Sequence, residues 1–313
     1  MALPSVLDCI SLQVAALSGK IRRSAPGFIA SSKAMTALWV QSADGTPISS
    51  EIYGEGRPLV VVSGALFASA LWQRVVPRLS AGRSVVVVDR RGRGQSGDQP
   101  SYAPEREIED LLAVLGALSG PVDLLGHSSG AILSLQVALR APANLERLVV
   151  YEPPVFFAAP DRIAEDLPER LEALLARGQA ELAVDTFFRE GPRTSESELS
   201  AMKTGPAWAS MVKVLAKTVP YDARVQRSFT GTASELSGIR VRTLMLLGAE
   251  SPERMRRGAE TIAARLPNAE LRELPGQQHV AMLTAPLAFA AAVAKFLAFE
   301  PSAPGPAPAQ SDA

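Results

Sequence analysis

The segment Gly126-His127-Ser128-Ser129-Gly130 lies between an apolar run, 122–125, and a helix-like stretch, 131–140. A serine at the tip of a sharp strand-to-helix turn needs small residues two positions before and after it. A Cβ at either position would collide with the neighbouring strand or helix. Gly126 and Gly130 meet this requirement. Ser128 is therefore a candidate nucleophile, and in the alternative interpretation it only caps the helix that follows.

Histidine is scarce in this chain, because His127 and His279 are the only two. His127 is adjacent to Ser128 and is expected to point elsewhere around the turn. His279 ends the glycine-containing loop 275–279, which follows an apolar run and precedes a helix. A nucleophilic serine needs a base that accepts its proton, and histidine is the usual one. We therefore expect His279 to be the general base.

Short apolar runs alternate with helical patterns along most of the chain. The runs are 59–62, 85–88, 122–125, 148–151, 241–247 and 271–274, and the candidate helices are 105–118, 129–140, 252–266 and 286–299. Continuous apolarity indicates strands that are covered on both faces. The sequence thus predicts an α/β fold with a doubly wound, mostly parallel sheet. Segments 37–40 and 48–53, around the turn dipeptide Asp44-Gly45, predict an antiparallel hairpin at its edge.

The interval 153–238 interrupts this alternation and is too long for a loop in a compact domain. Its segments 163–177 and 181–189 show helical periodicity. We expect residues 153–238 to form a helical cap over the carboxyl edge of the sheet, where Ser128 opens. The core would then consist of residues 37–152 and 239–299.

The two ends of the chain differ from this core. Apolar residues from Val6 to Ile21 recur at helical spacing, so residues 1–36 are predicted to form an N-terminal helical extension that lies on the body. It could instead dock a partner subunit or a membrane surface. Residues 300–313 are mostly Pro, Ala, Ser and Gly, which predicts a disordered tail.

Composition excludes several classes of protein. The 313 residues are 47% hydrophobic and 20% charged, as a globular enzyme requires. Thirty-two basic residues balance 32 acidic ones and aromatics make up 5%, so nothing suggests nucleic-acid binding. With Cys9 as the sole cysteine and two histidines, we expect neither a disulfide nor a metal.

The same sequence predicts a cytoplasmic protein. It has no apolar stretch of about 18 residues, so we expect no transmembrane helix. The N-terminus lacks the basic start of a secretory signal. A homo-oligomer is compatible with these features.

From Leu38 to Phe299 the chain resembles the α/β-hydrolase fold superfamily, on four segments in order. Ser63-Gly64-Ala65-Leu66 stands where the family commonly has His-Gly and then an oxyanion-hole residue. Asp89-Arg90-Arg91-Gly92-Arg93-Gly94-Gln95-Ser96-Gly97 resembles the family's Asp-x-Arg-Gly-x-Gly-x-Ser loop. The serine turn and the Gly-x-x-His loop at His279 complete the set.

The resemblance leaves the acid of the triad open. In the family it often follows the strand after the cap, but here that stretch is Gly248-Ala249-Glu250-Ser251, with serine in the usual register. A second site in the fold follows the strand after the nucleophile helix, and here Glu152 stands there, before two stiffening prolines. Glu152 is our first choice and Glu250 the alternative. Either could also be a carboxylate that only contacts solvent or the cap.

The resemblance implies a serine hydrolase that forms an acyl-enzyme on Ser128, with backbone N–H groups of Ala65 and Ser129 as the oxyanion hole. We expect it to cleave a carboxylic ester or lactone of a small, largely apolar substrate without a cofactor. Candidate substrate contacts are Leu66, Phe156, Phe157, Phe187 and Trp208. A cofactor-free lyase, a carbon-carbon bond hydrolase or a perhydrolase on this scaffold are alternatives, as is a non-catalytic binding protein.

Overall fold

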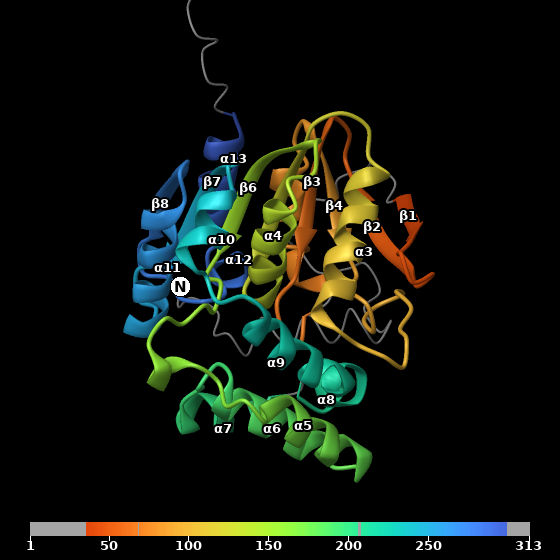
Figure 1. Cartoon of the computed structure of the whole chain (residues 1–313), viewed down its shortest axis with the longest axis vertical. Helices are drawn as coiled ribbons and strands as arrows, with labels where there is room; N and C mark the ends of the chain where they lie inside the picture. The colour runs from red at the N-terminus through yellow and green to blue at the C-terminus, as the bar shows by residue number, and fades with distance from the viewer. Residues whose placement is uncertain (1–35, 68, 206–207, 299–313) are drawn as a thin grey trace, which may run out of the picture.

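The computed structural model describes residues 36–67, 69–205 and 208–298. The predicted N-terminal extension, apart from Thr36, and the predicted tail at 300–313 lie outside these residues. Figure 1 shows a twisted sheet with helices on both faces and a separate layer of helices beyond one end of the strands.

The sheet contains eight strands in the described part of the chain. They are β1 (Thr36–Gln41), β2 (Pro47–Tyr53), β3 (Arg57–Val62), β4 (Arg83–Val88), β5 (Val122–His127), β6 (Leu145–Tyr151), β7 (Arg242–Gly248) and β8 (Ala269–Leu274). Their spatial order is β1-β2-β4-β3-β5-β6-β7-β8. The pairs β1–β2 and β2–β4 are antiparallel and all others are parallel. The predicted hairpin and mostly parallel sheet are confirmed.

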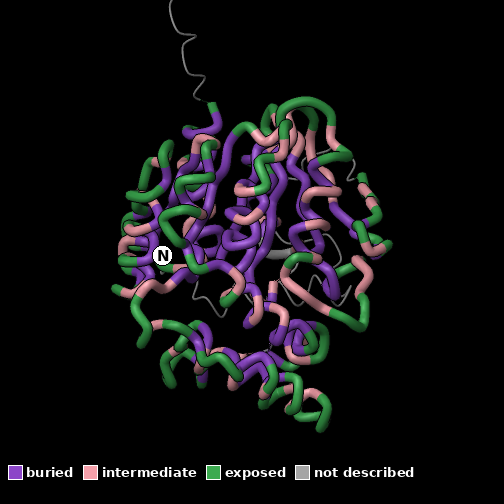
Figure 2. The backbone as a smooth tube through the Cα atoms, in the orientation of Figure 1, coloured by how far each residue is buried: buried purple, intermediate pink, exposed green. Residues whose placement is uncertain are grey.

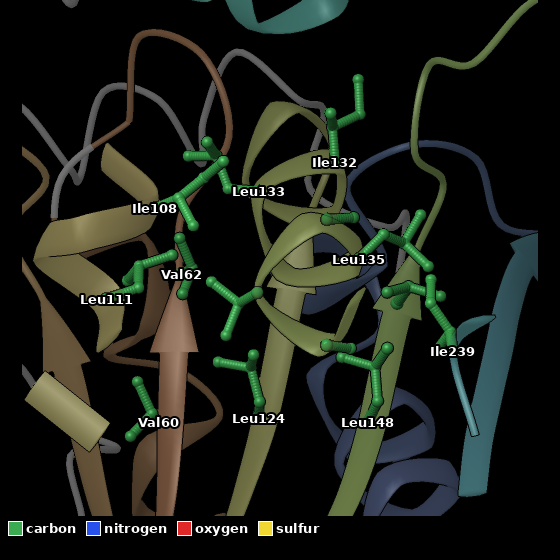
Figure 3. Packing of buried hydrophobic residues seen from close by; sticks show 14 of the residues in the cluster. Val60, Val62, Ile108, Leu111, Leu124, Ile132, Leu133, Leu135, Leu148 and Ile239 are labelled. Carbon is green, nitrogen blue, oxygen red and sulfur yellow. The ribbon is translucent and has the colours of Figure 1, made fainter. Parts of the chain in front are cut away.

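Both faces of the sheet are covered, as the continuous apolar runs predict. In β3, Val60 and Val62 belong to one buried cluster and Leu59 and Val61 to another. The first cluster packs under α3 (Pro104–Gly116), α4 (Ser129–Leu139) and α11 (Glu253–Arg265), and the second under α2 (Val76–Leu79), α12 (Ala281–Thr284) and α13 (Pro286–Ala298). Figure 3 shows side chains of the first cluster from neighbouring strands and from α3 and α4. The central strands β3 to β7 are buried over most of their length, whereas β1 and β8, at the two edges of the sheet, are largely exposed or half-buried (Figure 2).

The predicted cap is a helical insertion between β6 and β7. It contains the 3-10 helices η2 (Ala159–Asp161) and η3 (Ala216–Thr218) and the helices α5 (Leu167–Ala176), α6 (Ala180–Glu190), α7 (Glu196–Thr204), α8 (Trp208–Leu215), α9 (Val219–Ser228) and α10 (Ala233–Gly238). Helices α5 to α9 share an apolar cluster, which includes Leu171 and Leu199 and, from the loop after β3, Leu66. Helices α5 to α8 form the separate layer in Figure 1, and α9 lies between this layer and the sheet.

The insertion returns to the core earlier than the predicted boundary at residue 238. Val225 and Phe229, at the end of α9, and Leu236 of α10 belong to the main cluster under the sheet. Helix α10 packs against α4 and α11. Periodicity alone did not separate α10 from the cap, because a short amphipathic helix has the same pattern in either place.

Two glycines allow α4 to lie very close to the sheet. A Cβ on Gly126, in β5, would lie 2.4 Å from Ser134 Oγ and 2.6 Å from the carbonyl oxygen of Gly130. A Cβ on Gly130, in α4, would lie 2.5 Å from the carbonyl oxygens of Val62 and Ser63 at the end of β3. Both positions therefore exclude any side chain, as the spacing of the two glycines around Ser128 predicts.

The substitution Gly130→Ala tests this close approach. The new methyl group would meet backbone oxygens that cannot move aside cheaply, so we expect the free energy of unfolding to fall by about 1–3 kcal/mol. The control is Gly116→Ala in α3, where a Cβ meets nothing within 4 Å and stability should stay equal or rise by up to about 1 kcal/mol. Urea unfolding compares the two variants. Equal midpoints would contradict the steric argument.

Candidate active site

Ser128 occupies the turn between β5 and α4, which we call the elbow. Its backbone angles are φ 53° and ψ −123°, a conformation that residues other than glycine rarely adopt. Such strain persists only where the surrounding structure imposes it, and it concentrates at functional sites. Ser128 is mostly buried, with 7% of its surface exposed. The elbow thus presents a serine at the carboxyl end of a central strand.

Glu152 and His279 form a hydrogen-bonded pair at the same edge of the sheet. Glu152 directly follows β6, and its Oε2 lies 2.7 Å from Nδ1 of His279. Its other oxygen, Oε1, accepts from the backbone N–H of Gly248 at 2.7 Å and from Ser251 Oγ at 2.5 Å. Because a carboxylate accepts hydrogen bonds, Nδ1 of His279 carries a proton in this pair. Nε2 is then left as the basic nitrogen.

The Glu152 carboxylate stays ionised although it is buried. Burial alone would raise its pKa, but the hydrogen bond with His279, the charge of His279 and the hydrogen bonds from Ser251 and Gly248 together lower it below the usual range of a glutamate. An ionised carboxylate can orient the imidazole and stabilise an imidazolium. Only 1% of Glu152 is exposed, so water screens this interaction little.

Glu250 lies elsewhere. It is exposed, and its backbone N–H donates to the carbonyl oxygen of Gln277. No hydrogen bond links its side chain to His279 within the described ranges. Ser251, in the register where the family often has its acid, donates to Glu152 instead. The structure therefore brings Glu152, and not Glu250, to His279.

His127 supports the loop that carries His279. The two imidazole rings lie 4.7 Å apart, and Nε2 of His127 lies 2.9 Å from the carbonyl oxygen of His279. Burial, together with the charge of His279, holds the pKa of His127 well below its ordinary value, so its ring is neutral and Nε2–H donates. Tyr151 adds to the support, because its hydroxyl donates to the carbonyl oxygen of Gln278. The sequence alone predicts that His127 points elsewhere around the turn. The signal for its supporting role is its position directly before Ser128, at the end of a buried strand.

These contacts place the His279 loop against the elbow. Across residues 36–67, 69–205 and 208–298 no hydrogen bond joins Ser128 Oγ to His279. The two residues are brought together through His127, which precedes Ser128 directly and holds the His279 backbone. Proton transfer between Ser128 and His279 therefore belongs to the functional proposal below.

The loop after β3 also lies against Ser128. A Cβ on Gly64 would lie 2.7 Å from Ser128 Cβ. The next residues are Ala65 and Leu66, and Leu66 has a positive φ of 55°. Ser129 is the first residue of α4, where a helix leaves its N–H groups unpaired. Among the described residues, neither the N–H of Ala65 nor that of Ser129 has a hydrogen-bond acceptor. Both groups are thus available to a ligand.

The predicted substrate contacts divide into two groups. Leu66, Phe187 and Trp208 belong to the apolar cluster of the insertion, and Phe187 is fully buried there. Phe156 and Phe157 instead lie beside α11, with the guanidinium groups of its Arg254 and Arg265 at 5.0 and 4.6 Å from their respective rings. The structure therefore separates Phe156 and Phe157 from the cluster that contains Leu66. In the described part of the chain no group of three His, Cys, Asp or Glu could hold a metal, and no helix is long and apolar enough to cross a membrane.

The lowered pKa of Glu152 predicts a pH-dependent contribution to stability. A carboxylate of this kind stabilises the fold above its unfolded pKa, about 4.5, and loses that contribution as pH falls through its lower folded pKa. We expect the stability advantage of wild type over Glu152→Gln to shrink as pH falls below about 4.5. Urea unfolding at several pH values measures it. A stability difference between wild type and Glu152→Gln that stays constant over this pH range would contradict the prediction.

Comparison with known proteins places this site in a family. Residues 59–292 match the profile described as the alpha/beta hydrolase family. The (E)-2-((N-methylformamido)methylene)succinate hydrolase of Acinetobacter baylyi is 26% identical over 238 residues, which are 74% of this chain and 87% of that protein. The 2-hydroxy-6-oxo-2,4-heptadienoate hydrolase of Pseudomonas putida is 39% identical over 103 residues, 31% of this chain and 37% of that protein.

Comparison with solved structures gives the same fold. An alpha/beta hydrolase from Sphaerobacter thermophilus is 39% identical and superposes with a TM-score of 0.77, covering 83% of this chain and 100% of that one. The enol-lactonase from Burkholderia xenovorans, at 18% identity, has a TM-score of 0.67 over 83% of this chain and 99% of its own, a likeness of fold alone. The same conclusion follows from the sequence match over residues 59–292 and from the elbow at the carboxyl edge of a mostly parallel sheet. This chain belongs to the alpha/beta hydrolase family.

Proposed function

We propose that this protein is a serine hydrolase that cleaves a carboxylic ester or lactone through an acyl-enzyme on Ser128. The observation that carries the proposal is the 2.7 Å hydrogen bond between Glu152 and His279, in a loop held against the elbow of Ser128. A base that is oriented by a buried carboxylate, next to a strained serine, is the arrangement that nucleophilic acyl transfer requires.

In the proposed reaction Ser128 Oγ attacks the carbonyl carbon of the substrate and its proton passes to Nε2 of His279. The carbonyl π electrons move onto oxygen, and this oxyanion accepts hydrogen bonds from the N–H groups of Ala65 and Ser129. The tetrahedral intermediate then expels the alcohol, which takes the proton from His279. Water, activated by His279, hydrolyses the acyl-enzyme and regenerates Ser128. Glu152 stabilises the imidazolium in both halves of the cycle.

The surroundings of the proposed oxyanion hole favour an apolar substrate. Leu66 belongs to the apolar cluster of the insertion and Ala65 packs against it. A substrate carbonyl that reaches these N–H groups would therefore lie next to apolar side chains. Pockets of this composition bind small, largely apolar molecules and use a few polar groups to orient them. We accordingly assign Leu66 to the substrate pocket, with Phe187 and Trp208 behind it.

Cleavage of a carbon-carbon bond is the second candidate. It is favoured by the similarity to the enzyme named 2-hydroxy-6-oxo-2,4-heptadienoate hydrolase, at 39% identity over 103 residues. The same serine, histidine and oxyanion donors could serve that reaction, because they act on a carbonyl group in both cases. Turnover of that compound, compared with turnover of esters and lactones, separates the two candidates.

Covalent labelling tests the nucleophile. A fluorophosphonate probe should react with the wild type, because an activated serine attacks its phosphorus. Labelling should be lost in Ser128→Ala and kept in Ser237→Ala, a change at an exposed position of α10. Mass spectrometry locates the adduct. An unlabelled wild type, or a label that persists in Ser128→Ala, would overturn the proposal.

The acid is tested by turnover of acyl esters and lactones of graded chain length. Glu152→Gln keeps the size of the side chain but removes the charge that orients His279, so we expect kcat to fall roughly a thousandfold or more. Glu250→Gln serves as the matched control and should stay within about twofold of wild type, as an exposed substitution does. The opposite result would make Glu250 the acid.

A further inference from the structure

Four buried charged side chains form a cluster next to the loop that follows β3. Arg90 and Arg93 come from the loop after β4, Glu107 from α3 and Asp222 from α9, and each is at most 3% exposed. Arg90 binds both oxygens of Glu107, with N–O distances of 2.6 and 2.7 Å. Asp222 accepts from Arg90 at 2.9 Å and from Arg93 at 2.7 Å. Two positive and two negative charges thus balance in the interior.

This charged cluster hydrogen-bonds to both segments that we assign to the oxyanion hole. Arg93 donates to the carbonyl oxygen of Gly64 at 3.1 Å. Arg90 donates to Ser129 Oγ at 2.9 Å. Ser129 Oγ in turn donates to Asp222 at 2.9 Å. The cluster therefore contacts the loop after β3 and the first residue of α4 at the same time.

The contact with Gly64 bears directly on the N–H of Ala65. The carbonyl of Gly64 and this N–H belong to one planar peptide unit, so a donor that holds the oxygen also fixes the direction of the N–H. A charged donor on the carbonyl also polarises the peptide and strengthens the hydrogen bond that its N–H can donate. Gly64 lies against Ser128, because a Cβ added to Gly64 would collide with Ser128 Cβ. Arg93 is thus one peptide away from the proposed oxyanion.

Asp222 ties this arrangement to the insertion. Burial would raise the pKa of Asp222, but the charges of Arg93 and Arg90 lower it, so its carboxylate is ionised at neutral pH. Buried ion pairs are weak evidence for stability, because apolar residues of similar volume often serve equally well. The hydrogen bonds from Arg90 and Arg93 to the active-site segments supply another reason for burying these charges.

We propose that Arg93 and Asp222 are positioning residues of the oxyanion hole. Arg93 holds the peptide Gly64–Ala65 with its N–H toward the reacting carbonyl, and Asp222 on α9 holds Arg93. The oxyanion hole is then complete only when α9 is docked on the core. This inference rests on the proposed function, in which Ala65 donates to the oxyanion.

The test is the double variant Arg93→Met/Asp222→Asn. It removes one charge of each sign, so Arg90 and Glu107 remain as a balanced pair and the fold should persist, which thermal melting checks. Without the donor on Gly64 we expect kcat on an ester to fall about ten- to a hundredfold, less than for outright loss of an oxyanion donor, with KM within about threefold. Affinity for a boronic acid that mimics the tetrahedral intermediate should fall by the same factor as kcat. The single variant Arg93→Lys keeps a cationic donor, so its kcat should fall less than that of the double variant.

The matched control is Arg91→Met/Asp110→Asn. Arg91 and Asp110 form an equally buried pair between the same loop and α3, at 2.7 Å, and among the described residues neither side chain is hydrogen-bonded to the loop after β3. This control should keep the wild-type kcat. An unchanged kcat and boronic acid affinity in the Arg93→Met/Asp222→Asn variant, or an equal loss in the control, would overturn the positioning role.

Ala65→Pro distinguishes this result from failure of the proposed function. It deletes the N–H itself, so we expect a loss of about a hundredfold or more. A loss in Ala65→Pro with full activity in the double variant would refute the role of Arg93 and Asp222 alone. Full turnover in both Ala65→Pro and Ser128→Ala would refute the proposed function, and with it this role.

Discussion

The close contact between α4 and the sheet is the constraint on which the site depends. Gly126 and Gly130 have no side chain, so the helix begins directly at the end of β5 and packs on the backbone of β3. Ser128, in the turn between strand and helix, has a positive φ of 53°. The strain is maintained by the packing of the whole layer around it. The position of Ser128 is therefore a consequence of the core, and not of the turn alone.

The carboxyl edge of the sheet gathers residues that are far apart in the chain. The ends of β3, β5 and β6 supply Gly64, Ser128 and Glu152, and the loop after β8 supplies His279. Parallel strands that share one direction bring all these ends to one edge. Hydrogen bonds then fix the loops relative to one another, through His127 to the backbone of His279 and through Glu152 to Gly248 and Ser251.

The protein has no net charge, but it buries a cluster of paired charged side chains. The chain has no net charge, so its overall electrostatic field offers little for substrate recruitment. In the interior, two arginines and two carboxylates lie next to the loop after β3 with almost no solvent exposure. Charges in such a place are costly unless they are paired and hydrogen-bonded, and here they are paired. The insertion contributes one of them, Asp222, so it takes part in the hydrogen bonds around the loop after β3.

The strands, the elbow, the hairpin and the presence of a helical insertion could be predicted from the sequence, because each depends on local spacing and on residue type. The choice of Ser128 and His279 also came from the sequence, since glycines flank only this serine at the required strand-to-helix position and histidine is nearly absent elsewhere. The carboxylate that pairs with His279, however, could not be chosen from the sequence alone. The sequence favours Glu152 but leaves Glu250 as an alternative, and only the path of two loops, 127 residues apart, brings Glu152 within hydrogen-bonding distance of His279. The charged cluster could not be predicted from the sequence either. The partners of Arg90 and Arg93 come from separate helices that meet only after folding. Local patterns determine which elements form, whereas contacts between distant side chains follow from how those elements pack.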